Sequence, residues 1–457
     1  MLTHQVVGVL ELASKYRYGL TSRGAPLYLF RPYDEALPDF IVGCAERDTT
    51  VNRIALVEVA ATAVSTGTEK PRGTLIRFFG PVGDYDAESA ALIQHYCPTR
   101  HRKEPIPEPD TSDDENRQAL DAAHGWIVFH VDPPGCRDID DAIAYHHETN
   151  TWAVIIADAA AAVPTGSPVD DVAREISQTF YDTDGSVVRP MLSRSISEDT
   201  ASLLPGHRRR GVALIGDHFA LVWVTVEHSF TYEAFPQSDI AVMLGLSSVE
   251  PHDWIAQQMI HYNTSAGRMF KKYAAGILRT QAPADAAAVA SWKQVSPELA
   301  HMANEAATYA NACEDANQGH AGLDLDAYAH ASSPLRRYAD LHNQRVLKAL
   351  LRRDAPPADA LLPAHLNERQ RACRRWARDQ HFLDTVTPGH VHTIDVVWVD
   401  PQRVWVPAWR RLLRLRHEDV REPGAVGRID IFCDPTRRNW RQRILTAPTR
   451  STPVAPQ

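Results

Sequence analysis

Four aspartates that directly follow an apolar run constrain this chain more than any other feature of its sequence. Residues 126–131 are mostly apolar and typical of a buried strand, and Asp132, Asp138, Asp140 and Asp141 follow within ten residues. Carboxylates at this density repel one another, so a folded chain holds them together only where solvent or cations neutralise the charge. The Pro-Pro-Gly turn after Asp132 folds the three later aspartates back toward the first.

This acidic segment predicts metal-dependent phosphoryl chemistry. Carboxylate oxygens are preferred ligands of hard divalent cations such as Mg²⁺. Two such ions about 3.5–4 Å apart form the usual clamp for in-line attack on a phosphodiester. An acidic surface loop and a calcium-binding turn are the alternatives. An EF-hand is excluded, because the segment lacks that motif's order of acidic residues and its distal glutamate.

Composition and missing motifs narrow the class of protein. The 457 residues are 44% hydrophobic and 23% charged, which suits globular domains of about 150 residues each. The sequence has no apolar run long enough to span a membrane and no secretory signal, so we expect an intracellular protein of the cytoplasm, with the nucleus as the alternative. Six scattered cysteines argue against a zinc site and a disulfide framework. P-loop, dinucleotide-binding, zincin and serine-hydrolase motifs do not occur.

Charge is divided unevenly along the chain. Residues 101–200 contain 7 Lys and Arg against 20 Asp and Glu, whereas residues 401–457 contain 12 against 5. Of the 48 basic residues 41 are Arg, whose planar guanidinium binds phosphate in a bidentate manner and stacks on bases. Genome base composition is the alternative reason for this excess. The acidic centre and the basic C-terminal segment are therefore expected to have different tasks.

Breaks in the pattern predict several domains. Five short apolar runs separated by Gly- and Pro-containing turns suit a small closed barrel of the OB type, followed by a helix over 87–96. The runs cover residues 6–10, 27–30, 40–42, 54–59 and 74–79. The expected segments are a cold-shock or OB-like barrel with its helix over 1–97, a linker over 98–120, a mixed α and β domain over 121–355, a basic helical connector over 356–389, and a small OB-like barrel with its tail over 390–457.

The middle domain is expected to combine buried strands with long helices. Strands are predicted over 126–131 and 152–157, and helices over 169–179, 251–280, 284–316 and 336–353.

The connector contains a predicted helix over 365–382, with Arg371, Arg374 and Arg378 on its basic face. That face is either only solvated or turned toward RNA. Short strands at 391–399, 403–406, 412–415, 427–432 and 443–445 predict the second barrel, which carries the positive charge.

Four ordered segments of the middle domain resemble the RNB exoribonucleases, the family of bacterial RNase II and RNase R and of the catalytic subunit of the eukaryotic exosome. The first is HVDPPGCRDIDDAIAYH (130–146), which resembles the family's catalytic motif. The others are residues 152–181, residues 189–210 and NQGHAGLDLDAYAHASSPLRRYADLHNQR (317–345), which is similar to the family's second diagnostic motif. The resemblance implies an α+β RNB catalytic domain flanked by small OB-type β-barrels.

The resemblance also implies roles for the acidic cluster. In the family, aspartates at the positions of Asp132, Asp138, Asp140 and Asp141 hold Mg²⁺, or alternatively Mn²⁺, together with the scissile phosphate. The carboxylate that matches Asp140 is the one tied most closely to cleavage. The arginine of the second motif falls on Arg336, where a guanidinium balances charge that builds up on the phosphate oxygens.

For Arg337 and Tyr181 two alternative roles remain, and for Tyr338 one role is expected. Arg337 either grips a neighbouring phosphate or serves packing. Tyr181 matches an aromatic position near the bound strand, where base stacking is worth roughly 1–3 kcal/mol, or it is a core ring. Tyr338 is expected in the core.

The chain departs from the family pattern at several positions. Ser248 aligns where a tyrosine that stacks the terminal base is usual, and Gln257 aligns where a glutamate is usual. Gln344 replaces a usual histidine in a role expected to be structural. The helical region over 248–318 is also shorter than in the bacterial enzymes. The changes at Ser248 and Gln257 and the shorter helical region bear on processivity and on the selection of the terminal nucleotide.

The resemblance implies a Mg²⁺-dependent hydrolytic 3′→5′ exoribonuclease with a two-metal mechanism that releases nucleoside 5′-monophosphates. Its expected partner is single-stranded RNA, with no membrane, no small-molecule cofactor and a monomeric state. One alternative is a catalytically weak or inactive RNB-like RNA-binding protein. The other is a distributive nuclease that trims short RNAs or single-stranded DNA.

Overall fold

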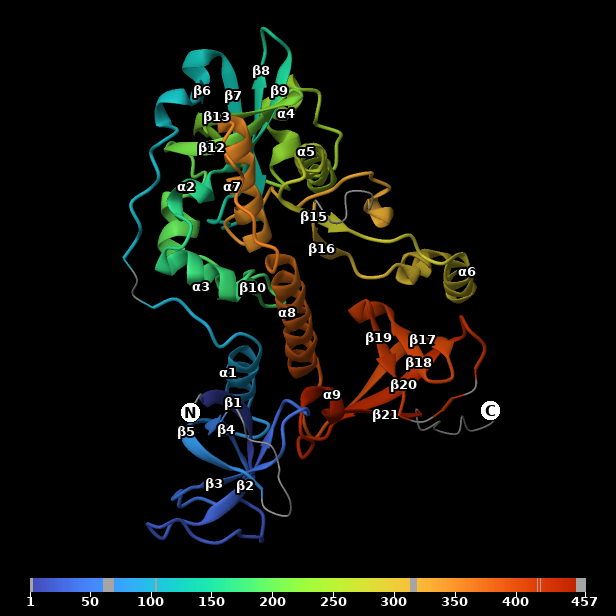
Figure 1. Cartoon of the computed structure of the whole chain (residues 1–457). Helices are drawn as coiled ribbons and strands as arrows, with labels where there is room; N and C mark the ends of the chain where they lie inside the picture. The colour runs from blue at the N-terminus through green and yellow to red at the C-terminus, as the bar shows by residue number, and fades with distance from the viewer. Residues whose placement is uncertain are drawn as a thin grey trace.

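Two small β-domains lie at one end of the molecule, and a long helix connects them to a larger domain of mixed α and β structure (Figure 1). The computed structural model describes residues 3–60, 70–102, 105–312, 319–416, 418–419 and 421–448. Within these ranges, no helix is both long enough and apolar enough to cross a membrane. This arrangement agrees with the expected class of a central α+β domain flanked by OB-type domains.

The N-terminal domain is a closed five-stranded barrel, as predicted. Its strands are β1 (Thr3–Leu10), β2 (Leu27–Pro32), β3 (Phe40–Gly43), β4 (Arg53–Ala60) and β5 (Arg72–Pro81), hydrogen-bonded in the order β1-β2-β3-β5-β4. Alternate side chains point inward and fill the barrel with Leu10, Phe30, Phe40 and Val57. Helix α1 (Tyr85–Tyr96) begins at the Asp84 cap and packs on the outside of the barrel.

The central domain is built on a seven-stranded sheet. Its strands are β6 (Gln118–Leu120), β7 (Trp126–Asp132), β8 (Asp141–His146), β9 (Thr151–Ala157), β12 (Arg208–Ile215), β13 (His218–Thr225) and β14 (His228–Thr231). They pair in the order β14-β7-β8-β9-β12-β13-β6. The edge strands β14 and β6 run parallel to their neighbours, and the other pairs are antiparallel.

Both faces of this sheet are buried, because the apolar side chains of each strand alternate between two cores. Val128 and Ala142 pack with the helices α2 (Ala159–Ala162) and α3 (Pro168–Ile176). Phe129 and Ile143 pack against α5 (Pro251–Tyr273) on the other face. Helix α7 (Tyr338–Arg352) contributes to both cores. Tyr338 is 4% exposed, which confirms the expected core position.

Two of the predicted long helices end earlier than expected. The helix expected over 251–280 ends at Tyr273, because Ala274 and Gly276 both adopt positive φ, and the strand β15 (Ile277–Thr280) follows. The helix expected over 284–316 is helical only in α6 (Ala286–Val295). Ser296 precedes a proline and is extended, which ends the helix.

A short 3₁₀ segment, η5 (Pro297–Ala303), and the strand β16 (Thr308–Asn311) follow α6. Strand β16 pairs with β15 in a hairpin. Residues 313–316 of the predicted helix lie outside the described part of the chain.

The predicted linker at 98–120 ends in a segment that is fixed to the central domain by buried charges. Arg117 pairs with Asp158, and Lys348 pairs with Asp158 over 2.8 Å and with Asp113 over 3.4 Å. Asp113 and Arg117 are both buried. The acidic residues of this segment therefore neutralise cations of the central domain.

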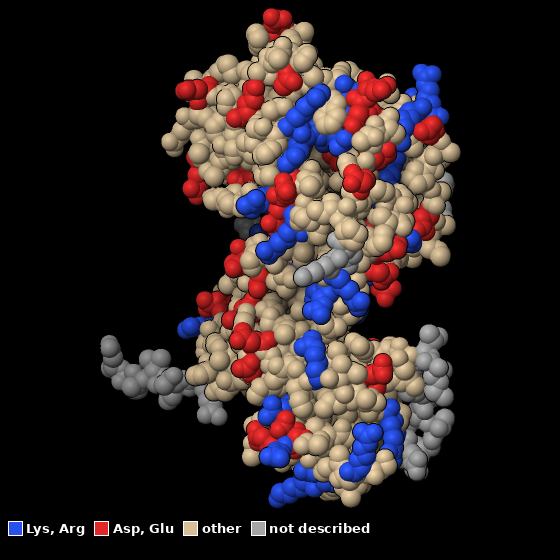
Figure 2. Space-filling view, turned by 90° about the vertical axis from the view of Figure 1, so that its left-hand side faces the viewer, with Lys and Arg blue, Asp and Glu red and all other residues tan. Residues whose placement is uncertain are grey.

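Helix α8 (Leu362–Thr385) is the structural bridge of the molecule. Its 24 residues span about 36 Å between the central domain and the two β-domains. Tyr96 donates a hydrogen bond to Asp379 over 2.6 Å, and Tyr85 donates one to Asp384 over 2.9 Å, so α1 is tied along this helix. Viewed from the side, the molecule narrows at this level, and basic side chains lie on the narrow part (Figure 2).

The C-terminal domain has the five strands that the sequence predicts. They are β17 (Val391–Asp400), β18 (Arg403–Val406), β19 (Arg411–Arg414), β20 (Val426–Cys433) and β21 (Ile444–Pro448), in the order β19-β18-β17-β20-β21. In the described residues no strand ladder joins β19 to β21. Instead, Arg416 N–H donates to Thr446 Oγ1 over 2.9 Å. The sheet is therefore an open half-barrel, at the position where the sequence analysis expected a small OB-like barrel.

Candidate active site

The acidic loop lies where strand β7 ends at Asp132 and strand β8 begins at Asp141. Gly135 adopts φ 78° in the turn between them, a backbone conformation that favours glycine. The loop returns the chain to the same end of the sheet. The antiparallel pairing of the two strands therefore brings the aspartates of both ends together, as the sequence predicted.

Asp140 is the most enclosed of the four aspartates, at 4% exposed. Its Oδ1 accepts a hydrogen bond from the Leu335 N–H over 2.9 Å, and its Oδ2 accepts one from Arg336 Nε over 3.1 Å. Burial raises the pKa of Asp140 to about 7 despite the opposing effect of Arg336. The Arg336 side chain is 43% exposed, and its Nη2 donates a hydrogen bond to Ser333 Oγ over 3.1 Å.

The other three aspartates have different partners. Asp132 Oδ2 lies 2.8 Å from Nδ1 of the buried His130. Asp138 accepts a hydrogen bond from the Tyr181 hydroxyl over 3.1 Å, and the Cys136 thiol lies 3.5 Å from its other oxygen. Burial, and then the charges of Asp132 and Asp140, hold the pKa of Asp141 well above its usual range.

One cavity of about 780 Å³ is lined by all four predicted aspartates, by Tyr181 and by Arg336. The hairpin of β10 (Phe180–Tyr181) and β11 (Val187–Arg189) closes one side, and helix α5 contributes His252 and Met259 on another. The structure therefore brings the whole predicted catalytic set together, from segments far apart in the sequence.

Tyr232 is a lining residue that the sequence reasoning missed. It directly follows β14, whose Thr231 lies opposite Asp132 in the parallel ladder. Burial, and then Asp132 and Asp141, raise its pKa to about 12. Its ring contacts that of His252 at 5.5 Å in an edge-on arrangement. A single aromatic after a short edge strand is too weak a pattern to single out without the sheet order.

The two departures noted in the sequence lie outside this cavity. Ser248 is exposed in the turn before α5, and Gln257 is exposed on that helix. Neither is among the lining residues, whereas Ile255 and Ala256 beside Gln257 are. Gln344 is fully buried and binds the backbone of Ala157 and Ala160, which agrees with the structural role expected of it.

The donor set at the acidic loop fits a hard divalent cation chemically, because Asp132, Asp138 and Asp141 present carboxylate oxygens to the cavity. Burial, and then the like charges of Asp132 and Asp140, raise the pKa of Asp141, and a bound cation would compensate those charges. Both oxygens of Asp140 are bound by protein donors in this structure.

The tightest group of potential ligand atoms in the described residues lies elsewhere. Glu250, His252 and Asp253 bring one atom each within 4.8 Å of the others, a condition that no three of the four aspartates meet. All three are exposed at the start of α5, and Glu250 serves as the helix cap. Such a group occurs commonly without an ion.

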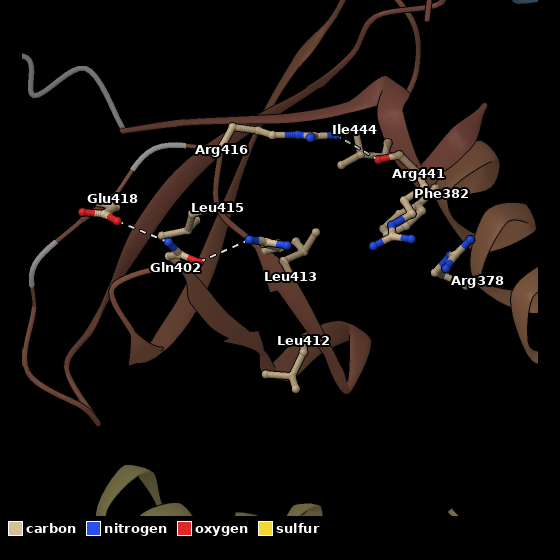
Figure 3. A pocket seen from close by; sticks show the side chains of 11 residues that line it. Arg378, Phe382, Gln402, Leu412, Leu413, Leu415, Arg416, Glu418, Arg441 and Ile444 are labelled. Carbon is tan, nitrogen blue, oxygen red and sulfur yellow. Dashed lines mark hydrogen bonds between the residues drawn. The ribbon is translucent and has the colours of Figure 1, made fainter. Parts of the chain in front are cut away.

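The remaining predicted RNA-binding residues do not line the acidic cavity. Arg337 pairs with Asp340 over 2.7 Å. Arg371 and Arg374 are exposed on α8. Arg378 pairs with Asp379 and reaches a second cavity, about 700 Å³ in volume, between α8 and the open edge of the C-terminal sheet (Figure 3).

This second cavity is lined by both basic and apolar side chains. Arg414 donates to Gln402 over 3.3 Å, and Gln402 donates to Glu418 over 3.2 Å (Figure 3). Arg416 donates to the carbonyl of Arg441 over 3.1 Å. Leu412, Leu413, Leu415, Phe382 and Ile444 supply the apolar part of the lining.

Comparison with known proteins agrees with this geometry. The RNB domain family matches residues 120–221 and 227–353. The chain is 26% identical over 241 residues to exosome complex exonuclease RRP44 homolog A of Arabidopsis thaliana, covering 50% of this chain and 25% of that protein. It is 25% identical over 346 residues to exoribonuclease 2 of Aeromonas hydrophila, covering 55% of this chain and 51% of that protein. The chain thus spans about half or less of the length of these relatives.

Solved structures show the same fold. The chain is similar to yeast Ssd1, described as a pseudonuclease, with a TM-score of 0.68 at 16% identity, covering 94% of this chain and 66% of that one. It is also similar to RNase R of Mycoplasma genitalium in complex with ribose-methylated single-stranded RNA. That match has a TM-score of 0.65 at 12% identity and covers 97% of this chain and 100% of that one. The likeness confirms an RNB-type domain with flanking OB-type domains.

Proposed function

The chain belongs to the RNB-domain family, and on that premise we propose that it is a divalent-cation-dependent, hydrolytic 3′→5′ exoribonuclease. Its substrate would be single-stranded RNA, and its products nucleoside 5′-monophosphates. Mg²⁺ is the proposed cation, with Mn²⁺ as an alternative. The curated relatives named exoribonuclease support the class of reaction, and the acidic cavity supports the chemistry.

The observation that carries this proposal is the joint placement of Asp140 and Arg336 at the cavity. A phosphodiester that enters the cavity would meet the carboxylates of the acidic loop together with the side chain of Arg336, which is bound to Asp140 and also lines the cavity. Arg336 would stabilise charge on the phosphate oxygens as the leaving group departs. Leu335 N–H and Arg336 together orient Asp140.

Divalent cations held by Asp132, Asp138 and Asp141 would supply charge neutralisation and Lewis acidity, with two ions in the proposed arrangement. The chain's own contribution is to hold these ligands in place. Tyr181 orients Asp138 through its hydroxyl, and His130 orients Asp132. Partners of this kind fix the direction of metal-binding carboxylates.

The aromatic rings of the cavity would contact bases. Tyr181 comes from the β10–β11 hairpin and Tyr232 from the end of β14, so the cavity has two tyrosines. Stacking on such rings is tolerant of sequence, which suits an enzyme that removes each nucleotide in turn. Ser248 aligns with a tyrosine that usually stacks on the terminal base. In this chain Tyr232 would supply that aromatic contact instead.

The C-terminal sheet and α8 would attract the RNA backbone. Arg378, Arg414, Arg416 and Arg441 surround the second cavity, and Arg371 and Arg374 are exposed on the same helix as Arg378. Guanidinium groups release counterions from phosphates, so this attraction should weaken as salt increases.

An RNA-binding protein without turnover is the second candidate, because one structural neighbour is described as a pseudonuclease. The four aspartates and Arg336 favour an enzyme, since loss of a ligand is the simplest route to inactivity. A distributive nuclease on short RNA or single-stranded DNA is a variant of the first proposal.

Product analysis separates these candidates. The purified chain would be incubated with a single-stranded RNA of defined sequence, first with a chelator and then with excess Mg²⁺. The proposal predicts nucleoside 5′-monophosphates on chromatography only after Mg²⁺ is added, and none from an RNA whose 3′ end is blocked. Binding without products supports the second candidate. Equal cleavage of a matched DNA contradicts RNA as the preferred substrate.

A further inference from the structure

Ser202 binds the acidic loop on both sides of Asp138. It is fully buried and is not among the residues that line the acidic cavity. The Ser202 hydroxyl donates a hydrogen bond to the carbonyl of Arg137 over 2.7 Å and accepts one from the Ile139 N–H over 3.0 Å. One hydroxyl therefore satisfies the two backbone groups that flank Asp138 in the chain.

Few other backbone bonds hold the acidic loop around Asp138. The loop lies between strands β7 and β8 and outside the sheet ladder. In the described part of the chain, the backbone N–H and C=O of Asp138 form no hydrogen bond. The next residue, Ile139, is bound a second time, because its carbonyl accepts a hydrogen bond from the Leu203 N–H over 3.1 Å. The direction in which the Asp138 side chain leaves the loop is therefore set by neighbours that Ser202 and Leu203 hold.

The segment that carries Ser202 is itself anchored to the central domain. It follows η3 (Ile196–Thr200), a single π-helical turn of the kind found frequently at functional sites. The Ser202 carbonyl accepts a hydrogen bond over 3.0 Å from Nε of Arg209, which lies on strand β12. Leu203 is fully buried in the core that also contains Val128 of strand β7. The central sheet therefore fixes the place of the hydroxyl behind the loop.

Asp138 carries the side chain that this support directs. Its carboxylate lines the acidic cavity and accepts the hydrogen bond from the Tyr181 hydroxyl. The same carboxylate is one of the proposed ligands of the divalent cation. Loss of a group that orients a metal ligand without touching the metal typically costs about 10–100-fold in affinity or activity. Ser202 supports the backbone of this ligand, as Tyr181 supports its side chain.

We propose that Ser202 is a positioning residue of the cation site: its hydroxyl holds the peptide groups on both sides of Asp138, so that this carboxylate stays directed into the cavity beside Asp132 and Asp141. This inference rests on the proposed function for its ligand, a hard divalent cation. Ser202 itself would touch neither the cation nor RNA. It acts by reducing the orientations that the loop can adopt before the cation binds, which preorganises the site.

Metal binding measured without RNA tests this role. The full chain would be titrated with Mn²⁺, and the free ion would be measured by electron paramagnetic resonance. Ser202→Ala removes both bonds to the loop, so the Kd for Mn²⁺ should increase by about 10–100-fold. Ser197→Ala is the matched control and should leave Kd unchanged. Ser197 is a buried serine of the preceding π-helical turn, and its hydroxyl donates to the carbonyl of Ser193 over 3.4 Å instead of to the acidic loop. Asp138→Asn identifies the ions that the loop binds.

Amide hydrogen exchange separates positioning from a general loss of stability. In Ser202→Ala the Ile139 N–H loses its acceptor and should exchange faster, while the amides of strand β12 keep the protection that they have in the wild type. If Ser202→Ala does not fold, Arg209→Gln repeats both measurements. It removes the bond to the Ser202 carbonyl at a partly exposed residue, and it should weaken Mn²⁺ binding by a smaller factor.

Either of two results would overturn the role of Ser202: Mn²⁺ affinity that Ser202→Ala leaves unchanged, or an equal loss of affinity in Ser202→Ala and Ser197→Ala. Weaker binding in Ser202→Ala with unchanged exchange at Ile139 would also overturn it, because the loss would not pass through the loop. If the wild-type chain binds Mn²⁺ through Asp138 but releases no nucleotides from RNA, the proposed exonuclease fails while this titration still measures the role of Ser202.

Discussion

Arg336 Nε lies 3.1 Å from Asp140 Oδ2, although 196 positions separate the two residues in the chain. The neighbouring backbone N–H of Leu335 binds the other oxygen of the same carboxylate. The turn before α7 is therefore fastened to the acidic loop at the residue proposed to be most important for cleavage. One contact both orients the carboxylate and positions a cation beside the phosphate.

Replacing Arg336 should slow the chemical step more than it weakens binding. Arg336→Gln removes the charge that faces the phosphate, and loss of one such transition-state contact typically costs about 10²–10³ in rate. We expect kcat for RNA shortening to fall by about that factor while KM changes little. Single-turnover kinetics measure the two separately. Arg268→Gln is the control, because Arg268 is an exposed arginine of the same domain that pairs with Asp326. A change confined to KM would contradict the assigned role.

The metal-free protein should lose stability as the pH rises. The pKa of Asp140 is raised to about 7, whereas an unfolded aspartate has a pKa of about 3.9. Between these values the folded chain binds the extra proton, so the free energy of unfolding decreases as pH rises from about 4 to about 7. Asp141, also raised, acts in the same direction.

Urea unfolding with chelator at pH 5 and pH 8 measures this effect. Asp140→Asn cannot ionise, and it also removes a charge that raises the pKa of Asp141. Its decrease should therefore be smaller than that of the parent. Mg²⁺ should stabilise the parent more at pH 8 than at pH 5. If the free energy of unfolding changed equally with pH in the two proteins, the pKa of Asp140 would not be raised in the folded chain.

Tyr181 should contribute through two separable parts of its side chain. Tyr181→Phe keeps the ring and removes the hydrogen bond to Asp138, so we expect weaker dependence on the cation at low Mg²⁺ with RNA affinity retained. Tyr181→Ala also removes the ring and should weaken RNA binding by roughly 1–3 kcal/mol if a base stacks there. Equal RNA affinity for the two variants would assign the ring to packing.

The two β-domains should depend on one buried ion pair for their mutual position. Arg443 Nη1 lies 2.7 Å from Glu88 Oε1, both side chains are inaccessible to solvent, and Tyr33 donates a hydrogen bond to the other oxygen over 2.9 Å. Arg443→Met leaves the buried Glu88 carboxylate without a counter-charge, so we expect a loss of about 3–5 kcal/mol in unfolding free energy.

The double variant Arg443→Met with Glu88→Gln is the control, since it removes the orphaned charge and should recover part of the loss. Chemical unfolding followed by tryptophan fluorescence reads the change, because Trp440 lies within this junction. An unchanged transition for Arg443→Met would mean that the pair contributes nothing to the junction.

Local chemistry explains which parts of the fold were predictable from sequence. The strands of both β-domains contain short apolar runs that turns separate, and their predicted positions were confirmed within a few residues. The acidic loop was predictable because β7, the turn and β8 are contiguous. The end of α6 was missed although Pro297 stood next to it, since the apolar residues beyond continue a helical pattern.

Contacts between distant segments were not predictable from pattern alone. Tyr232 enters the cavity only because β14 pairs in parallel with β7, and Arg279 binds Gln370 of α8 only because the β15–β16 hairpin lies beside that helix. Arg336 could be assigned from resemblance, but its bond to Asp140 required the folded chain. The open edge of the C-terminal sheet likewise depends on pairing that short strands do not specify.

The most direct test of the account compares the wild-type chain with Asp140→Asn on a 5′-labelled single-stranded RNA of defined length in Mg²⁺, sampled over time on a denaturing gel. We predict progressive shortening from the 3′ end by the wild type and none by the variant, with equal RNA binding by both. The spacing of the products reports whether shortening is processive or distributive. Cleavage by both proteins alike, or binding by both without any shortening, would contradict an exonuclease that acts through Asp140.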